Sequence, residues 1–339
     1  MAIAGFGKSQ LRYDMFDLTR SAAEARRLAK CEHIYHRGQT LAWDGKDVLG
    51  ELLAKHGGVR VPEAQRRALE RVFTIILWGE LAAWKISAQL ADRLVPLEAK
   101  LAATSQAHDE ARHFYVMHDY LAALGHTPGR LDRAPQALLD LVLETDDLAA
   151  KLMGMQLMIE TIALALFQAV REREVEPVLT ELMRYYERDE ARHVGLGMQY
   201  LPSLLAGMTR RQGMRLVTYQ VRILYWGLTE LRLVKDDFET LGIDPRAIIE
   251  SVRKKQLAAL GAAYEAVGIP FDRDRNWAAA SLNAAVELLF PPTPAAVTAR
   301  ARAAWDAFWR RNQPGSLDVF APHQHAIRTA RGQVASAGE

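Results

Sequence analysis

The pentapeptide Asp-Glu-Ala-Arg-His occurs twice in the chain, at Asp109–His113 and Asp189–His193, 80 residues apart. A glutamate and a histidine at positions i and i+3 of a helix lie on one face, one turn apart. Each copy therefore offers a carboxylate oxygen and an imidazole nitrogen side by side, and divalent transition metals bind such groups. The two pairs are Glu110 with His113 and Glu190 with His193.

A lone glutamate lies 30 residues before the glutamate of each pair, in a strongly apolar stretch. Glu80 is found within FTIILWGELAAW, and Glu160 within GMQLMIETIALALFQAV. A buried carboxylate is costly unless it is paired or bound to a metal. An ion pair with arginine would account for one such glutamate, but it does not explain the matched histidines. The pattern therefore predicts a metal site that both repeats share.

A proline lies close to the midpoint between the two glutamates of each repeat, Pro96 in the first and Pro177 in the second. Proline suits the first turn of the helix that it opens. Folding each segment back on itself at its proline brings the lone glutamate level with the glutamate–histidine pair. Two such hairpins packed face to face form a four-helix bundle with four carboxylates and two imidazoles at its centre.

The remaining sequence also predicts helices, since no strand-like alternation of apolar and polar residues occurs. Proline and glycine are sparse between residues 62 and 240. We expect an all-α fold whose long helices lie at about 62–92, 96–124, 135–172, 177–205 and 209–240. The bundle and one additional packing helix take residues 62–240. An N-terminal helical extension, 1–61, precedes them, and a C-terminal extension, 241–339, adds three helices and a loosely ordered tail after Pro314.

The composition of the chain bears on its cellular compartment and on the kinds of partner that it can bind. The formal net charge of +2 gives no reason to expect nucleic acid or an anionic membrane as a partner. The single cysteine, Cys31, cannot form an intrachain disulfide and fits a reducing compartment. The sequence has no signal peptide and no run of about 18 uncharged apolar residues, so we expect a cytoplasmic protein without membrane insertion.

The repeat resembles the ferritin-like di-iron carboxylate proteins, which place a glutamate on two helices and Glu-x-x-His on the other two. In the form Asp-Glu-x-Arg-His, it looks most like the hydroxylase subunits of bacterial multicomponent monooxygenases and the acyl-carrier-protein desaturases. The resemblance covers about residues 62–205 and implies a ferritin-like four-helix bundle with additional N- and C-terminal helices. The metal ligands that it implies are Glu80, Glu110, His113, Glu160, Glu190 and His193.

The resemblance also assigns roles to the other residues of each repeat. Asp109 and Asp189 would accept the second ring N–H of the ligand histidine from the other repeat, and Arg112 and Arg192 would hold these aspartates. The site would bind two iron ions, or manganese and iron, with dioxygen as co-substrate. Four carboxylates and two neutral imidazoles carry a charge that two ferrous ions balance.

Some branches of this family can be tested against single residues. The radical tyrosine of ribonucleotide reductase small subunits would fall at Met117, and the Val–Tyr crosslink of the ligand-binding oxidases at Ala82 and Met155. N-oxygenases carry an extra histidine four residues before the last glutamate ligand, where this chain has Tyr186. These departures argue against all three branches. Ferritins are much shorter, and the extra helices here suggest a covered pocket or a partner surface.

We therefore expect a non-haem di-iron oxidoreductase that activates dioxygen to hydroxylate, desaturate or otherwise oxidise an apolar small molecule or acyl chain. No flavin, nicotinamide or iron–sulfur motif is present, so the electrons must come from an external donor protein. The alternatives are a ferritin-type ferroxidase or metal-sequestering protein without an organic substrate, and a non-catalytic scaffold with a structural metal. The sequence leaves a homodimer open.

An oxidised substrate needs space beside the metals, so we expect an elongated apolar pocket that reaches the site. Residues about one turn from the ligands on the same helices would line it. These are Ile76, Ala83, Trp84, Ala163 and Leu164, with Gln106 and Gln156 as nearby polar contacts.

Overall fold

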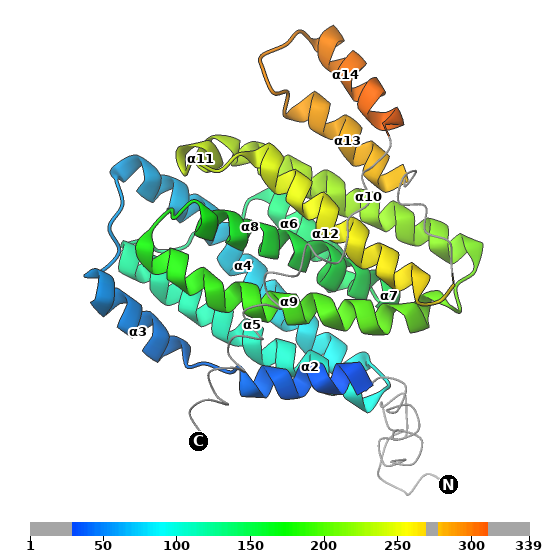
Figure 1. The fold of residues 1–339 in the computed structure, drawn as a ribbon, viewed down its shortest axis with the longest axis horizontal. Coiled ribbons are helices and arrows are strands. Elements are labelled where there is room, and N and C mark those ends of the chain that lie inside the picture. Colours follow the sequence, from blue (N-terminus) through cyan, green and yellow to red (C-terminus); the bar gives the residue numbers. More distant parts are fainter. Residues whose placement is uncertain (1–28, 269–276, 311–339) are drawn as a thin grey trace, which may run out of the picture.

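The computed structural model describes residues 29–268 and 277–310, so the predicted tail after Pro314 lies outside the described residues. Every element in these two ranges is helical and none is a strand, which confirms the predicted all-α fold (Figure 1). The helices are α2 (Ala29–Thr40), α3 (Gly45–His56), α4 (Glu63–Arg93), α5 (Leu97–Leu124), α6 (Arg133–Glu144), α7 (Leu148–Leu152), η1 (Met153–Ile159), α8 (Glu160–Glu172), α9 (Pro177–Leu205), α10 (Arg210–Leu233), α11 (Lys235–Thr240), α12 (Pro245–Glu265), α13 (Trp277–Leu289) and α14 (Val297–Trp309).

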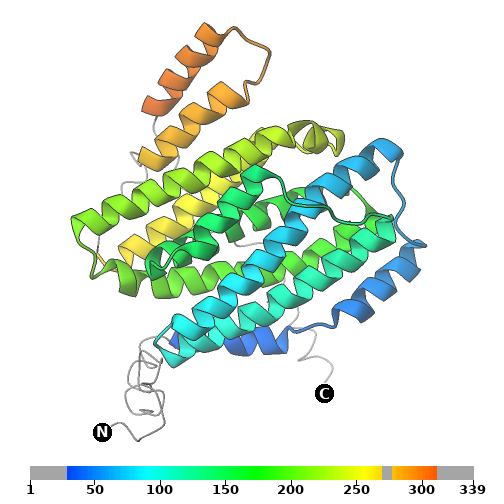
Figure 2. The same cartoon turned by 180° about the vertical axis from the view of Figure 1, so that it is seen from behind.

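Two helical hairpins, α4–α5 and α8–α9, form the central bundle (Figures 1 and 2). Pro96 directly precedes α5 and Pro177 is the first residue of α9, so each hairpin turns at a proline, as predicted. The carboxylate of Glu176 caps α9 by accepting a hydrogen bond from the N–H of Leu179 at 2.8 Å. The observed ends of α4, α5 and α9 lie within one residue of the predicted ones.

Two predicted helices are wrong in extent. The predicted helix 135–172 is interrupted after α6 and resumes with α7. In the interruption, Thr145 Oγ1 accepts a hydrogen bond from the N–H of Asp147 at 3.2 Å, and Asp147 Oδ1 accepts one from the N–H of Ala150 at 3.0 Å. These short polar side chains satisfy backbone groups outside the helical pattern and thereby end one helix and cap the next. The predicted helix 209–240 likewise divides into α10 and α11.

A π-helical segment, η1, lies directly before Glu160 and was not predicted. Helix α7 runs into η1 without a break, and α8 continues from it. The N–H of Glu160 bonds to the carbonyl of Met155, five residues back, where an α-helix would use the residue four back. Such segments are rare and often lie at functional sites.

The charged residues of the two repeats form a layer across the bundle, with apolar packing on both sides. On one side, Leu90 of α4 packs in the same cluster as Ala102 of α5. On the other side, Phe73 of α4 packs in the same cluster as Tyr120 of α5. The layer is therefore enclosed by apolar side chains above and below, which excludes bulk water from it.

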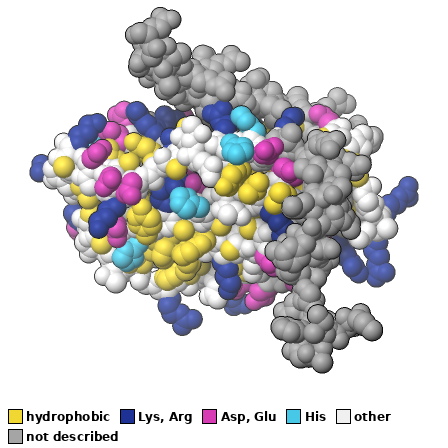
Figure 3. All heavy atoms as spheres, turned by 90° about the horizontal axis from the view of Figure 1, so that it is seen from below, with side chains coloured by type: hydrophobic (Ala, Val, Ile, Leu, Met, Phe, Trp, Pro, Cys, Tyr) yellow, Lys and Arg dark blue, Asp and Glu magenta, His cyan; other side chains and the backbone are white. Residues whose placement is uncertain are grey.

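The remaining helices cover the bundle. Helices α2 and α3 pack on α5 and α9, whereas α10 packs on α6, and α12 packs on α8 and α9. The hairpin of α13 and α14 lies at the edge, next to α10 (Figure 1). Figure 3 shows the face seen from below, where acidic and basic side chains lie among apolar ones. This mixture agrees with the nearly balanced net charge.

One segment of the described residues, Leu148–Glu172, is long and apolar enough to cross a membrane by length and composition alone. It is the continuous helix of α7, η1 and α8, and 72% of its most apolar stretch is buried inside the protein. Glu160 lies within it and is only 2% exposed. Its apolar composition is therefore that of a helix in the core of the bundle.

Candidate metal centre

Six side chains from four helices meet in the charged layer. Possible ligand atoms of Glu80, Glu110, His113 and Glu190 all lie within 4.8 Å of one another, and so do those of Glu110, Glu160, Glu190 and His193. The two groups share Glu110 and Glu190, and all six residues are buried. Two adjacent ligand sets that share two carboxylates are the arrangement expected of a di-metal carboxylate site.

The two halves of the cluster are closely matched. His113 Nδ1 lies 3.4 Å from Glu80 Oε2 and 3.3 Å from Glu190 Oε1. His193 Nδ1 lies 3.0 Å from Glu110 Oε1 and 3.7 Å from Glu160 Oε1. Each imidazole thus faces one lone glutamate and the carboxylates of both repeats. All six residues that the sequence analysis gave as metal ligands therefore lie together in this cluster.

The donor set fits two divalent cations. Glu110 Oε2 and His113 Nδ1 are buried and have no hydrogen-bond partner, so each of these atoms has a lone pair that could coordinate a metal ion. Burial raises the pKa of Glu80 and of Glu160 well above the ordinary value, and neighbouring carboxylates add to the rise against the lowering effect of His113 and His193. Four carboxylates cannot all ionise here without added positive charge, which two metal ions would provide.

The second ring nitrogen of each histidine is held by the other repeat. His113 Nε2 lies 3.3 Å from Asp189 Oδ2, and His193 Nε2 lies 3.3 Å from Asp109 Oδ2. A carboxylate in this position fixes the tautomer and the tilt of a ligand histidine. The crossed contacts also tie the two hairpins together, since each bond joins α5 to α9.

Two arginines close a ring around these aspartates. Arg112 Nη2 donates to Asp109 Oδ1 at 2.5 Å and to Asp189 Oδ2 at 2.9 Å. Arg192 donates to Asp189 Oδ1 and to Asp109 Oδ2, both at 2.8 Å. Burial acts to raise the pKa of Asp189, but His113 and the arginine charge outweigh it and hold that pKa well below the ordinary value. Burial also acts to raise the pKa of Asp109, but His193 and Arg192 outweigh it and lower that pKa, so both aspartates are ionised and balance the two arginines.

Trp43, in the connection between α2 and α3, extends this network and was not predicted. Its indole N–H donates to Asp189 Oδ2 at 2.8 Å. The guanidinium of Arg112 lies over its ring, 4.8 Å from the centroid. Trp43 is 146 residues from Asp189 and outside both repeats, so no local pattern could have linked them. The N-terminal extension therefore contributes to the metal centre.

Tyr186 lies four residues before Glu190, at the position where N-oxygenases carry an extra histidine. Its ring stacks on His113, with the ring centroids 4.2 Å apart and an angle of 18° between the planes. Its hydroxyl donates to the backbone carbonyl of His113 at 2.7 Å. Tyr186 thus fixes the position of a ligand histidine.

Of the two glutamines predicted as pocket contacts, Gln106 binds carboxylates of the cluster and Gln156 binds Gln106. Gln106 Nε2 donates to Glu160 Oε1 at 2.5 Å and to Glu110 Oε1 at 3.2 Å. Gln156, in η1, donates to Gln106 Oε1 at 2.8 Å. Gly197 of α9 allows η1 to approach, because a Cβ atom there would lie 2.6 Å from Gln156 Cβ.

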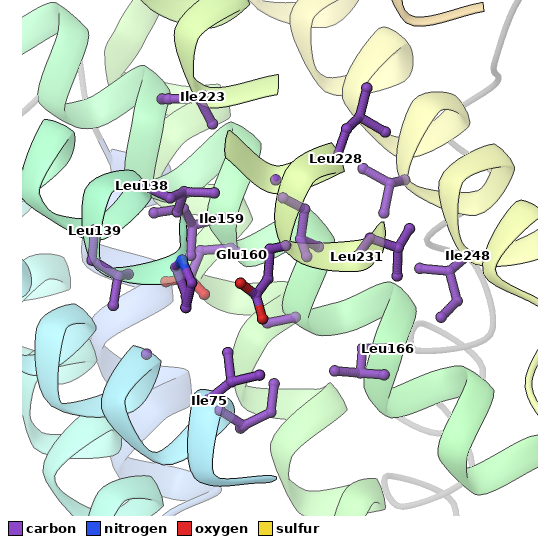
Figure 4. Close-up of a pocket in the computed structure, with 18 of the residues that line it drawn as sticks. Ile75, Leu138, Leu139, Ile159, Glu160, Leu166, Ile223, Leu228, Leu231 and Ile248 are labelled. Carbon is purple, nitrogen blue, oxygen red and sulfur yellow. The ribbon is translucent and has the colours of Figure 1, made fainter. Parts of the chain in front are cut away.

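An apolar cavity of about 200 Å³ reaches the cluster (Figure 4). Glu80, Glu160 and Glu190 form part of its wall. Three of the predicted lining residues, Ile76, Ala83 and Ala163, line it, and the other predicted lining residues do not. Trp84 is 41% exposed, and Leu164 lies in the core. Gln106 binds Glu160 and Gln156 binds Gln106, and neither glutamine lines the cavity. The opposite wall, from α6, α10 and α12, was not predicted, because these helices are distant in sequence.

The fold and the cluster define the class of the protein: it is a ferritin-like di-metal carboxylate protein, as predicted. A family model described as p-aminobenzoate N-oxygenase AurF matches residues 91–267, just over half of the chain. The chain therefore belongs to the AurF family. The matched range contains five of the six clustered residues, and Glu80 lies just before it. Membership confirms the predicted di-metal oxidase or oxygenase with an organic substrate.

Solved structures with the same fold include two groups of oxidases. A Synechococcus protein with aldehyde deformylating oxidase activity aligns with a TM-score of 0.52 and 21% identity, covering 60% of this chain and 92% of its own. A point mutant of an R2-like ligand-binding oxidase with a Mn/Fe cofactor aligns with a TM-score of 0.55 and 17% identity, covering 72% of this chain and 97% of its own. At such identities, the likeness shows the fold alone. No curated protein sequence matches the chain significantly.

The family match corrects one interpretation of the sequence. Tyr186, in place of a histidine, had argued against the N-oxygenase branch, yet the chain belongs to the family that is named after such an enzyme. The tyrosine instead packs against His113, which the sequence alone could not indicate. The finer likeness to monooxygenase hydroxylase subunits and desaturases stays a prediction.

Proposed function

We propose that the protein uses two ferrous ions, or manganese and iron, and dioxygen to oxidise an elongated apolar organic substrate in the cavity. Glu80, Glu110, His113, Glu160, Glu190 and His193 would hold the metals. One observation carries the proposal: the wall of the apolar cavity includes Glu80, Glu160 and Glu190. A bound substrate would therefore lie beside the metals, in a space from which water is excluded.

When bound, the metals would reduce dioxygen and supply the oxidising power. The protein's residues provide the remaining requirements. Asp109 and Asp189 orient the two histidines and keep their Nδ1 atoms directed into the cluster. Gln106 holds Glu160 and Glu110 through its amide N–H groups, so these carboxylates stay directed inward.

The stoichiometry of the proposed reaction sets how many electrons and protons must come from outside the protein. Inserting one oxygen atom of dioxygen into a substrate and reducing the other to water takes two electrons and two protons from outside. Desaturation of a substrate also reduces dioxygen fully to water and needs the same two external electrons. A separate electron-donor protein, in the cytoplasm, is therefore part of the proposal. The single cysteine, Cys31, is a free buried thiol, and a chain without a disulfide is compatible with a reducing compartment.

The test is to load purified protein anaerobically with ferrous iron and then admit air without a reductant. We expect two iron ions per chain to be bound and oxidised, after which oxidation stops until electrons are supplied. Oxidation continuing into tens of iron ions per chain, with the iron retained, would favour the ferritin-type alternative. Metal binding of fewer than two ions per chain would contradict the di-metal assignment.

A further inference from the structure

A single carboxylic acid interrupts the apolar wall of the cavity away from the metal cluster. The described residues that line the cavity are apolar or glycine, apart from the three clustered glutamates and Glu230 of α10. No lysine, arginine or histidine is among them. Glu230 is therefore the one group in this wall, outside the cluster, that can form a strong polar contact with a substrate.

The carboxyl group of Glu230 is not satisfied within the described structure. Both of its side-chain oxygens are buried, and neither has a hydrogen-bond partner. Arg71, the positive charge that acts on Glu230 electrostatically, is paired with Asp237 at 2.9 Å. Burial, followed by the like charge of Asp132, raises the pKa of Glu230 to about 7, against the effect of Arg71. An unpaired buried carboxyl is costly and is kept only rarely without a role.

The position of Glu230 gives the distance over which a substrate would extend. Arg71 and Asp132 do not line the cavity, but both act on Glu230 electrostatically, so the carboxyl group lies near the level of Arg71 on α4. Arg71 and Glu80 are nine residues apart on α4, which corresponds to about 13 Å along the helix axis. The wall between them, from Val72 to Gly79, is apolar. A polar group at Glu230 and a reacting atom at the metals would thus be joined by an apolar body.

We propose that Glu230 binds a protonated nitrogen of the substrate, which makes the substrate class an apolar amine that reacts at a site remote from that nitrogen. A protonated amine donates up to three hydrogen bonds and can satisfy both oxygens of Glu230. Its positive charge offsets the buried negative charge, whereas a carboxylate in the same place would be repelled. The apolar wall accommodates the remaining chain or ring system. This inference rests on the proposed function, in which the cavity is the substrate site.

Equilibrium binding tests the inference without any turnover. The probes are n-octylamine, n-octanol and n-octanoate, titrated calorimetrically into metal-loaded protein under anaerobic conditions at neutral pH. We expect the amine to bind at least tenfold more tightly than the alcohol, with octanoate the weakest, because hydrogen bonds to charged groups are worth this much in a buried site. In Glu230→Gln the advantage of the amine should disappear, while the affinity for octanol stays within about twofold.

Two further variants complete the design. Glu144→Gln removes the same charge at an exposed position outside the cavity and should keep the preference for the amine. Glu230→Leu should bind octanol at least as well as the native protein, which shows that the cavity is intact, and should lose the preference. Equal affinities of the native protein for all three probes would overturn the inference. So would a preference that survives in Glu230→Gln, since the nitrogen would then bind at the metals.

Failure of the proposed function can be distinguished from failure of this inference. Two oxidised iron ions per chain, together with no amine preference, would leave the di-metal oxygenase intact and remove only the role of Glu230. An amine preference that depends on Glu230, in protein that does not bind two metals, would remove the function and leave a binding site for amines.

Discussion

Replacing Glu230 by glutamine should remove a pH dependence of stability that the buried carboxyl imposes. Burial, and then Asp132, raises the pKa of Glu230 from 4.5 to about 7 in the folded protein, against the charge of Arg71. The folded state thus binds this proton more tightly than the unfolded state does. The contribution of Glu230 to the free energy of unfolding is therefore lost as the pH rises from about 4.5 to about 7 and stays lost above it.

The magnitude follows from the two pKa values. One pKa unit corresponds to 1.36 kcal/mol, so a rise from 4.5 to about 7 costs at most about 3.4 kcal/mol at high pH. The residue is only partly buried as a whole, and solvent screening reduces the effect. We expect the glutamine variant to be about 1–2 kcal/mol more stable than the native protein at about pH 8, and nearly equal to it at about pH 5.

Urea unfolding at the two pH values measures this difference, and Glu144→Gln serves as the exposed control. The comparison isolates Glu230, because the clustered glutamates and histidines titrate in both proteins alike. The change should lie in the midpoint of unfolding, with the slope unchanged. A variant that is less stable than the native protein at about pH 8 would show that the carboxylate has a partner, and would refute the reasoning. Equal differences at both pH values would do the same.

Three other predictions concern residues that support the centre. Asp109→Asn and Asp189→Asn should keep the helical circular dichroism spectrum but lower metal affinity by roughly 10–100-fold, because each aspartate fixes one histidine. Competition with a chelator measures the affinity. Unchanged affinity in both variants would show that the aspartates do not position the histidines. Trp43→Phe should lower metal affinity less than Asp189→Asn does, because it removes one donor and keeps the ring, and an equal or larger loss would contradict this order. Lys151→Met should lower the free energy of unfolding by about 2–4 kcal/mol in urea, because the ammonium group donates to Gln89 Oε1 and to the carbonyls of Val142 and Leu143 at 2.6–2.9 Å; a loss below about 0.5 kcal/mol would show that water replaces it.

The sequence predicted the centre well because its constraints are local. A glutamate and a histidine one helical turn apart lie on the same face of the helix. Pro96 and Pro177 then set where each hairpin turns, and because each lies close to the midpoint between two glutamates, Glu80 and Glu160 come level with their partners. Spacing along a helix is converted directly into position in space, so these residues could be placed without knowing the rest of the fold.

The remaining parts of the site depend on contacts between distant segments, which carry no such signal. Trp43 reaches Asp189 only because the connection between α2 and α3 lies against α9. Glu230 belongs to the cavity only because α10 packs across α6. The break at Thr145 was missed for a different reason: strong helix formers on both sides outweighed a short polar cluster in the prediction.

The π-helical segment has a consequence for comparing this chain with its relatives. A π-turn holds one residue more than an α-turn, so η1 contains a surplus residue that α4, its counterpart in the first repeat, lacks. Removing one residue from Met153–Ile159 would let the helix close as a regular α-helix with Glu160 unmoved. The α-helical turns on either side would keep their rotation about the helix axis, because the wide π-turn had absorbed the extra residue, and only side chains of the segment itself, Gln156 among them, would change direction. A relative could therefore differ by a single-residue gap at this point, with all its metal ligands aligned and a differently shaped wall beside them.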